Sequence, residues 1–259
     1  MHLDPDADAS ARLMTFDTLG STSAEALSRA RAGEQGPLWI VAERQTAGRG
    51  RRGNAWTSEP GNLFASLLLT EGLPAAHLPE LCFVVALGVR DAVAEAAPHL
   101  GPRLKLKWPN DLLLDGAKFA GILIEGETVR ERSVVVAGIG INCAHHPAGQ
   151  PYAVTDLAAS GAVVTPADLM RVLAHAMRAR LAQWDAGSGF ATIRAEWLSH
   201  AAGIGGDIRV RLSDRELSGK FETLDRMGRL MLRLPAGNLE AITVGEVFAP
   251  AHAGASTNG

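Results

Sequence analysis

The stretch L-K-L-K-W-P-N-D-L-L-L-D-G-A-K-F-A-G-I-L-I-E (residues 104–125) contains three short apolar runs. Each run has the length of a β-strand, and Asp115-Gly116 between the second and the third is typical of a two-residue hairpin turn. A fourth run, S-V-V-V-A-G-I-G-I-N (133–142), follows closely. The stretch therefore predicts a sheet that is built largely of antiparallel hairpins.

The residues on either side predict further strands and several helices. Short runs bounded by polar loops predict a short strand at 12–16 and buried strands at 38–42 and 62–69. Thr22 and Glu25 have the spacing of a capping box, and they stand before an alanine-rich segment. Together these elements predict an α+β domain with a mixed, largely antiparallel sheet and flanking helices. The helices are expected at 21–31, 78–97, 166–184 and 190–198.

The pattern changes after residue 203. Four or five short alternating runs separated by turns predict a small β-barrel, and the glycines of G-I-G-G (203–206) are typical of a hinge. We therefore expect a catalytic domain over 1–203 and a barrel domain over 204–250. The first ten residues are expected to be frayed, and residues 251–259 are expected to form a disordered tail.

The composition excludes several classes of protein. The 259 residues are 47% hydrophobic and 20% charged, and the longest apolar runs fall well short of the about 20 residues that a transmembrane helix needs. The N-terminus lacks the basic and apolar regions of a secretory signal, so a cytoplasmic enzyme with no membrane partner is expected. The two cysteines are too far apart to suggest a zinc knuckle or a disulfide framework. The net charge of −3 argues against a surface built for nucleic acid.

The segment G-R-G-R-R-G (48–53), called the glycine-arginine loop below, is the strongest chemical signal. Glycine lets the backbone approach a ligand closely, and arginine supplies planar, multidentate donors for phosphate or carboxylate. A solvated basic loop and a patch for nucleic acid are the alternatives. Because the loop lies between two predicted core strands, we favour a ligand-binding loop.

Two further segments carry related signals. The lysines at 107 and 118 flank the predicted hairpin, and both could present positive charge on the same side of a sheet to an anion. Ordinary strand-edge lysines are the alternative. In G-I-G-I-N (138–142), two glycines at the end of a buried strand indicate a close approach by another group, such as an adenine, or a plain bulge.

Taken together and in order, these segments resemble the biotin–protein ligases. The resemblance rests on S-T-S-A-E (21–25), Q-T-A-G-R-G-R-R-G-N-A-W (45–56), K-W-P-N-D (107–111), K-F-A-G-I-L-I-E (118–125) and G-I-G-I-N (138–142). G-E-V (245–247) is similar to the end of that family's C-terminal domain. The resemblance implies a class II synthetase-like catalytic fold followed by an SH3-like β-barrel.

The resemblance also implies a two-step reaction. Biotin and MgATP would give biotinyl-5′-AMP and pyrophosphate, and the biotinyl group would pass to a lysine of a biotin carboxyl carrier domain, such as that of acetyl-CoA carboxylase. Asp111 is the motif carboxylate that could take the proton of that lysine. The ligands of Mg²⁺ are left unassigned.

The implied site residues form three groups. Those with a catalytic role are Lys118, Arg49, Arg51 and Asp111. Those that bind biotin are Ser21, Thr22, Ser23, Gln45, Gly48, Arg49, Gly50, Arg51, Lys118 and Gly121. Those that bind ATP are Arg51, Arg52, Trp56, Lys107, Asn110, Lys118 and Asn142. Thr22 is thus expected to serve both as helix cap and as ligand.

Several departures and alternatives accompany this interpretation. Ser23 stands where the family usually has asparagine, and Asn54 stands where arginine is frequent. A lipoate ligase shares the chemistry but typically has R-R-x-G-G-G, and an RNA-binding module is disfavoured by the acidic net charge. Only about twenty residues precede S-T-S-A-E, too few for a helix-turn-helix module, so no DNA partner is expected. Whether the chain forms a homodimer is left open.

Overall fold

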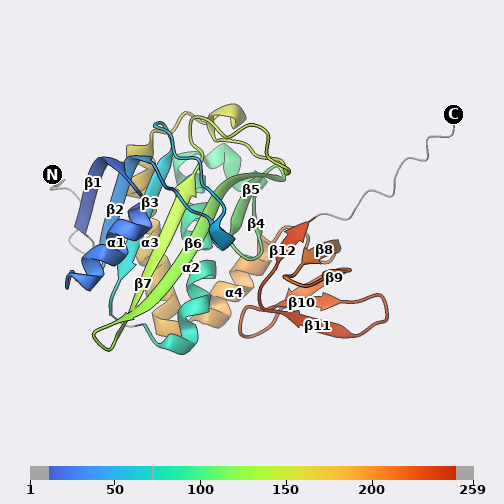
Figure 1. The fold of residues 1–259 in the computed structure, drawn as a ribbon. Helices are drawn as coiled ribbons and strands as arrows, with labels where there is room; N and C mark the ends of the chain where they lie inside the picture. The colour runs from blue at the N-terminus through green and yellow to red at the C-terminus, as the bar shows by residue number, and fades with distance from the viewer. Residues whose placement is uncertain (1–11, 72, 249–259) are drawn as a thin grey trace.

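The computed structural model describes residues 12–71 and 73–248, and it contains two β-sheets and four α-helices (Figure 1). The larger sheet has the order β1-β2-β3-β7-β6-β5-β4; β1 and β2 run parallel, and every other pair is antiparallel. The predicted α+β class with a mixed, largely antiparallel sheet is therefore confirmed. The strands of this sheet are β1 (Arg12–Leu19), β2 (Leu38–Gln45), β3 (Leu63–Leu69), β4 (Leu104–Lys107), β5 (Asp111–Leu114), β6 (Ala117–Val129) and β7 (Arg132–Ile141).

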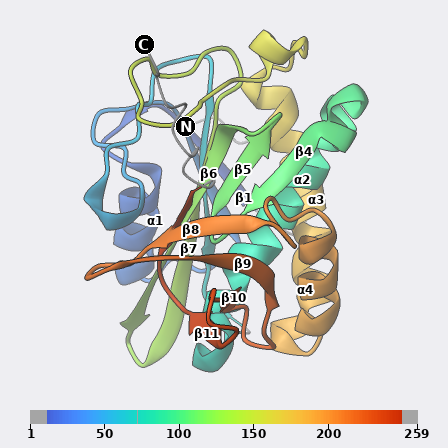
Figure 2. The same ribbon diagram turned by 90° about the vertical axis from the view of Figure 1, so that its right-hand side faces the viewer.

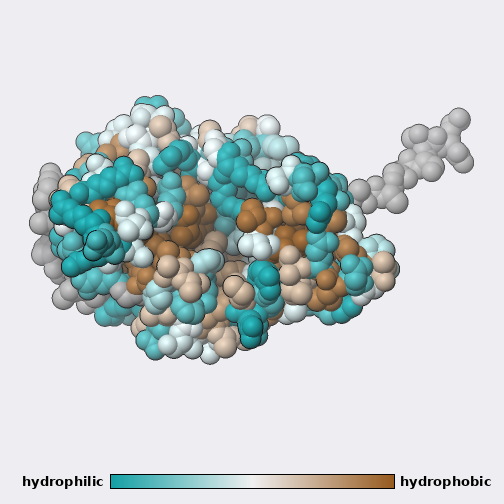
Figure 3. Space-filling view, turned by 60° about the horizontal axis from the view of Figure 1, so that its bottom comes forward, coloured by the Kyte–Doolittle hydropathy of each residue, from teal (hydrophilic) through white to brown (hydrophobic). Residues whose placement is uncertain are grey.

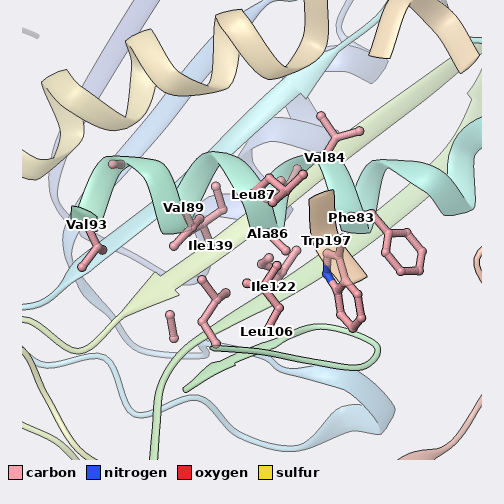
Figure 4. Close-up of a cluster of buried hydrophobic side chains, with 14 of the residues drawn as sticks. Phe83, Val84, Ala86, Leu87, Val89, Val93, Leu106, Ile122, Ile139 and Trp197 are labelled. Carbon is pink, nitrogen blue, oxygen red and sulfur yellow. The ribbon is translucent and has the colours of Figure 1, made fainter. Parts of the chain in front are cut away.

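Helices cover both faces of the larger sheet. The helix α1 lies on one face, and α2 and α3 lie on the other (Figure 1). The apolar side chains of α2 point onto Leu106, Ile122 and Ile139 of the sheet and onto Trp197 of α4 (Figure 4). Because α2 is enclosed by the sheet on one side and α3 on the other, it is apolar nearly all round. The helices are α1 (Thr22–Arg31), α2 (Leu81–Ala96), α3 (Pro166–Trp184) and α4 (Phe190–Ser199), with short 3₁₀ turns at Arg51–Gly53, Ala75–Glu80, Pro98–Arg103, Ala158–Ser160 and Asp185–Gly187.

The N-cap of the first helix lies one residue earlier than the capping-box pattern indicated. Ser21 is the N-cap, with extended backbone and a hydroxyl that accepts from the amide of Ala24. The expectation that Thr22 caps the helix is therefore wrong, because Thr22 is already the first helical residue. Its hydroxyl is consequently available for contacts inside the protein.

The second sheet follows α4 and is antiparallel throughout, with the order β11-β10-β9-β8-β12. Seen from the side, it stands in front of the larger sheet and next to α4 (Figure 2). The indole Nε1 of Trp108, in the turn between β4 and β5, donates to the carbonyl of Gly228 at 3.2 Å and so ties the two sheets together. The strands are β8 (Asp207–Arg211), β9 (Glu216–Leu224), β10 (Leu230–Arg233), β11 (Leu239–Ile242) and β12 (Glu246–Phe248).

After residue 203 a small β-barrel was predicted, and the structure has a small β domain there, formed by one antiparallel sheet of five strands. The expected frayed start and the expected disordered tail at 251–259 lie outside the described residues. Among the helices that the structure describes, none is long and apolar enough to cross a membrane.

Candidate functional site

A pocket of about 150 Å³ lies where the glycine-arginine loop, the start of α1, the β4–β5 turn and strand β12 meet over the larger sheet. Between α1 and the C-terminal strands the surface is hollowed, and hydrophobic residues lie in the hollow (Figure 3). A second cavity, of about 910 Å³, lies between α3 and strands β1 to β3. It is larger, but none of the predicted site residues lines it, so the chemistry belongs to the smaller pocket.

A row of four residues crosses the sheet beneath this pocket. Lys107 of β4 pairs with Asp111 of β5, which pairs with Gly121 of β6, which pairs with Gly140 of β7. The two glycines leave room for the indole of Trp56, since a Cβ at Gly140 would lie 2.5 Å from it and one at Gly121 would lie 3.0 Å from it. The register of β7 is regular at 138–141, so the alternative of a plain bulge in that segment is wrong. The glycine at 140 instead allows the close approach of the indole.

A bulge does occur in the neighbouring strand, and it directs Lys118 into the pocket. Between Leu112 and Leu113 of β5 the register shifts, so that β6 carries one extra residue. Phe119 and Ala120 consequently both face the core, and Lys118 lies on the same side as Gly121 although the two are three positions apart. The Nζ atom of Lys118 lies 2.6 Å from Oδ1 of Asp111.

Both lysines of the site share this carboxylate. The Nζ atom of Lys107 lies 3.9 Å from Oδ2 of Asp111, which bears out the expectation that the two lysines face the same side of the sheet. Burial is the largest influence on Lys107, and it lowers the pKa of this lysine below its usual value. The nearby charge of Lys118 lowers that pKa further, whereas Asp111 and Glu246 oppose the shift.

The three arginines of the glycine-arginine loop contact three different elements. Arg51 Nη1 donates to Asn110 Oδ1 at 3.0 Å, in the β4–β5 turn. Arg49 Nη2 donates to Glu125 Oε1 of β6 at 3.2 Å, and the guanidinium of Arg52 lies 3.8 Å from the carboxylate of Glu246 on β12. The loop therefore spans the pocket from β6 to the C-terminal sheet.

The base of the glycine-arginine loop packs tightly against the chain that follows it. A Cβ at Gly48 would lie 2.5 Å from both the carbonyl oxygen of Trp56 and the hydroxyl of Ser58. Arg52 has a φ of 56° and Gly53 a φ of 76°, which turns the chain back at the tip. Gly48 is thus a packing requirement, and it does not line the pocket.

A chain of hydrogen-bonding side chains forms one end of the pocket. Ser66 of β3, which is fully buried, donates to the hydroxyl of Thr22 at 2.8 Å and lies 3.1 Å from that of Ser23. Both the amide and the hydroxyl of Thr22 donate to Oε1 of Gln45, whose amide nitrogen donates to Ser58. These groups offer donors and acceptors next to apolar surface, as a polar ring with both kinds of group requires.

Most of the predicted site residues meet at the pocket, and three do not. Arg52 and Asn142 do not line it, and neither does Gly48. The side chain of Asn142 is buried and donates to the carbonyl of Thr155, so it holds the segment that follows β7. The predicted residues that line the pocket are Ser21, Thr22, Ser23, Gln45, Arg49, Gly50, Arg51, Trp56, Lys107, Asn110, Asp111, Lys118 and Gly121.

The sequence reasoning missed three aromatic residues that line the pocket, Trp108, Tyr152 and Phe248. Tyr152, 44% exposed, has its ring 5.7 Å from the ammonium of Lys118, because backbone bonds hold residues 153–155 beside that lysine. Phe248 of β12 lies 5.6 Å from the Nζ atom of Lys107 and 4.7 Å from the guanidinium of Arg211. Tyr152 is the single tyrosine of the chain, which was a usable signal; nothing near G-E-V indicated that Phe248 faces the site.

The arrangement is suited to anionic ligands. Two lysines and three arginines border the pocket or its rim, while Asp111 offsets part of that charge. In the part of the chain that the structure describes, no group of three or more histidine, cysteine or acidic side chains could hold a metal ion.

The chain matches the Biotin/lipoate A/B protein ligase family over residues 20–142 and the Biotin protein ligase C terminal domain over residues 203–249. It is 42% identical over 238 residues to the biotin–[acetyl-CoA-carboxylase] ligase of Paracoccus denitrificans, covering 88% of this chain and 96% of that protein. The protein of the same name from Mycobacterium tuberculosis is 32% identical, covering 88% of this chain and 85% of the relative. The biotin protein ligase of Aquifex aeolicus, solved in complex with biotin and ATP, has a TM-score of 0.76 at 25% identity and covers 91% of this chain and 97% of its own.

Proposed function

The chain belongs to the biotin protein ligase family, and on that premise we propose that it joins biotin to a lysine of a carrier protein in two steps. In the first step the carboxylate of biotin attacks the α-phosphorus of MgATP, and pyrophosphate leaves. In the second the amine of the acceptor lysine attacks the acyl carbon of biotinyl-5′-AMP, and AMP leaves. The observation that carries the proposal is the contact between Lys118 and Asp111 at the end of a pocket bordered by arginines.

The first step brings together two anions, so it needs fixed positive charge. Lys118 is assigned to the biotin carboxylate and the α-phosphate, where it offsets their repulsion and the charge of the transition state. Arg49 and Arg51 supply further donors, and Lys107 supplies a second ammonium. Mg²⁺ enters as part of the substrate MgATP.

Biotin needs an apolar pocket that ends in donors and acceptors for its ureido ring. The hydrogen-bonded side chains of Thr22, Ser23 and Gln45 offer both, supported by the fully buried Ser66, and Ser21 lines the pocket beside them. We assign Gly48, Gly50 and Gly121 to the backbone shape of this end of the pocket. Two observations support this assignment: a Cβ at Gly48 would lie 2.5 Å from the carbonyl oxygen of Trp56, and a Cβ at Gly121 would lie 3.0 Å from the Trp56 indole.

The nucleotide is assigned to the region around Trp56, Asn110 and Arg52. Trp56 presents an indole next to Lys118, with the ammonium 5.4 Å from the ring, and Tyr152 faces the same ammonium. Such aromatic surfaces suit a purine ring. Asn142 is assigned an indirect role, because it anchors the segment that carries Tyr152.

In the second step the acceptor lysine must lose a proton. Asp111 is assigned as the group that accepts it, and the Nζ atom of Lys118 lies 2.6 Å from this carboxylate. The carrier is expected to be the biotin carboxyl carrier domain of a carboxylase such as acetyl-CoA carboxylase. We further propose a cytoplasmic location and a division into a catalytic domain (1–203) and a C-terminal domain (204–250).

Exchange of labelled pyrophosphate into ATP tests the proposal, because it reports adenylation without a carrier. Exchange that depends on biotin, and that Lys118→Ala abolishes, is the expected result. Exchange that depends on lipoate instead would mean that the protein activates lipoate and not biotin. No exchange with either acid would refute the proposal.

A further inference from the structure

Among the described residues, Glu125 of β6 has a hydrogen-bond partner for one carboxylate oxygen and none for the other. Its Oε1 atom accepts from Arg49 Nη2 at 3.2 Å. Its Oε2 atom is buried and has no hydrogen-bond partner among the residues that the structure describes. A buried, unpaired carboxylate oxygen is costly and uncommon, so it indicates an acceptor that awaits a donor.

A neighbouring pair on the same strand shows the contact that Glu125 lacks. Glu127, two residues further along β6 and so on the same face, accepts from Arg31 Nε at 2.8 Å and from Arg31 Nη2 at 2.6 Å. Both of its oxygens are therefore paired in a bidentate contact. Arg31 belongs to the last turn of helix α1, whereas Arg49 belongs to a loop, and their side chains are 61% and 49% exposed. The strand thus carries a bidentate pair with the arginine that a helix presents, and a single contact with the arginine that the loop presents.

We propose that Glu125 is the positioning residue that closes the glycine-arginine loop. When the pocket is filled, the guanidinium of Arg49 moves onto both oxygens of Glu125, and the bidentate pair holds the loop over the bound acyl-adenylate. Glu125 does not line the pocket, so it acts through Arg49 and not on the ligand. The inference rests on the proposed function, since a mixed anhydride is the ligand that must be kept from water.

The contacts of the other two arginines of the loop are less suited to hold it closed. Arg51 is held by Asn110, a neutral amide that contributes one acceptor. Arg52 and Glu246 are 3.8 Å apart, and each side chain is more than a third exposed, so solvent weakens their attraction. The side chain of Glu125 is about one quarter exposed, and it stands on a strand inside the larger sheet. Of the two carboxylates that contact the loop, Glu125 is therefore less exposed to solvent than Glu246.

The test compares Glu125→Gln with Glu127→Gln, which removes a carboxylate from the same face of the same strand. Each variant is loaded with labelled biotin and ATP, and two quantities are measured: the rate of biotinyl-5′-AMP formation and its rate of release from the enzyme. Glu125→Gln is expected to form the adenylate within about twofold of the parental rate and to release it about tenfold faster. Glu127→Gln is expected to match the parent in both.

Amide hydrogen exchange of residues 45–56 is a second measurement. If Glu125 only stabilised the fold, its replacement would not change how far ligands slow exchange in this segment. In the parent and in Glu127→Gln, biotin with ATP is expected to slow exchange there; in Glu125→Gln the slowing is expected to be lost. If Glu125→Gln does not fold, Glu125→Asp replaces it in the test. Its side chain keeps the negative charge but is too short to contact the Arg49 guanidinium with both oxygens. Release at the parental rate from the folded Glu125 variant would overturn the inference. Failure of the parent to form any adenylate would instead overturn the proposed function, and the inference with it.

Discussion

The Nζ atom of Lys118 lies 2.6 Å from Oδ1 of Asp111, and the two residues come from adjacent antiparallel strands. A straight β6 would place Lys118 on the opposite face from Gly121, which pairs with Asp111. The one-residue bulge reverses that orientation for Lys118. The pair is thus a product of the sheet register, and the chemistry assigned to it depends on that register.

Replacement of Asp111 by asparagine is expected to separate the two steps. Biotin-dependent pyrophosphate exchange should persist within about tenfold, since Lys118 and the arginines remain, whereas transfer to the carrier should fall by about 10²-fold or more. Single-turnover transfer from preformed biotinyl-5′-AMP measures the difference. Asp115→Asn, at the exposed hairpin turn and paired with Arg103, is the control and should behave as the parent. Transfer by Asp111→Asn at the parental rate would contradict the role of this carboxylate.

A methyl group at Gly140 is expected to displace Trp56. The added Cβ would lie 2.5 Å from the indole, so the ring must leave its place and nucleotide binding should weaken by about tenfold or more. The KM for ATP in pyrophosphate exchange is the measurement. Gly126→Ala on β6, whose Cβ would find its nearest neighbour at 3.7 Å, should leave that KM unchanged. Equal effects of both substitutions would show that the indole contact is irrelevant.

The pH dependence of nucleotide binding is expected to report Lys107. Because burial lowers the pKa of this lysine, its positive charge is lost at a lower pH than that of an exposed lysine. The KM for MgATP should therefore rise on the alkaline side before ordinary lysines titrate. Lys107→Arg keeps its charge across this range, so its profile should be flatter. Superimposable profiles for the two proteins would argue against Lys107 as a phosphate contact.

Loss of the bond between Trp108 and Gly228 is expected to lower stability. Trp108→Phe leaves the buried carbonyl of Gly228 without its donor, and the free energy of unfolding should fall by about 1–3 kcal/mol. Urea unfolding without ligands measures it. Trp197→Phe is the matched control, because the Nε1 atom of that buried indole has no hydrogen-bond partner among the described residues. A loss in Trp108→Phe no greater than in the control would mean that the bond contributes little.

Elements whose signals are local were predictable from the sequence. The hairpin at Asp115-Gly116 has positive φ at both residues, as its turn type requires, and α3 spans the predicted 166–184. The cap of α1 was misplaced by one residue because Ser21, Thr22 and Ser23 are all acceptable caps in sequence. The packing of Thr22 against Gln45 and Ser66 decided among them.

The sequence by itself determined the fold class, the family and the residue types of the site, because turn signals, strand runs and ordered motifs lie within short segments. Only the tertiary structure decided which of those residues share a surface. The bulge that directs Lys118 into the pocket, the approach of Phe248 and the pairing of Arg49 with Glu125 all depend on strands that are distant in the chain. A strand alternates its side chains with period two, so one extra residue changes every assignment beyond it, and the packing of neighbouring strands fixes where that residue is placed.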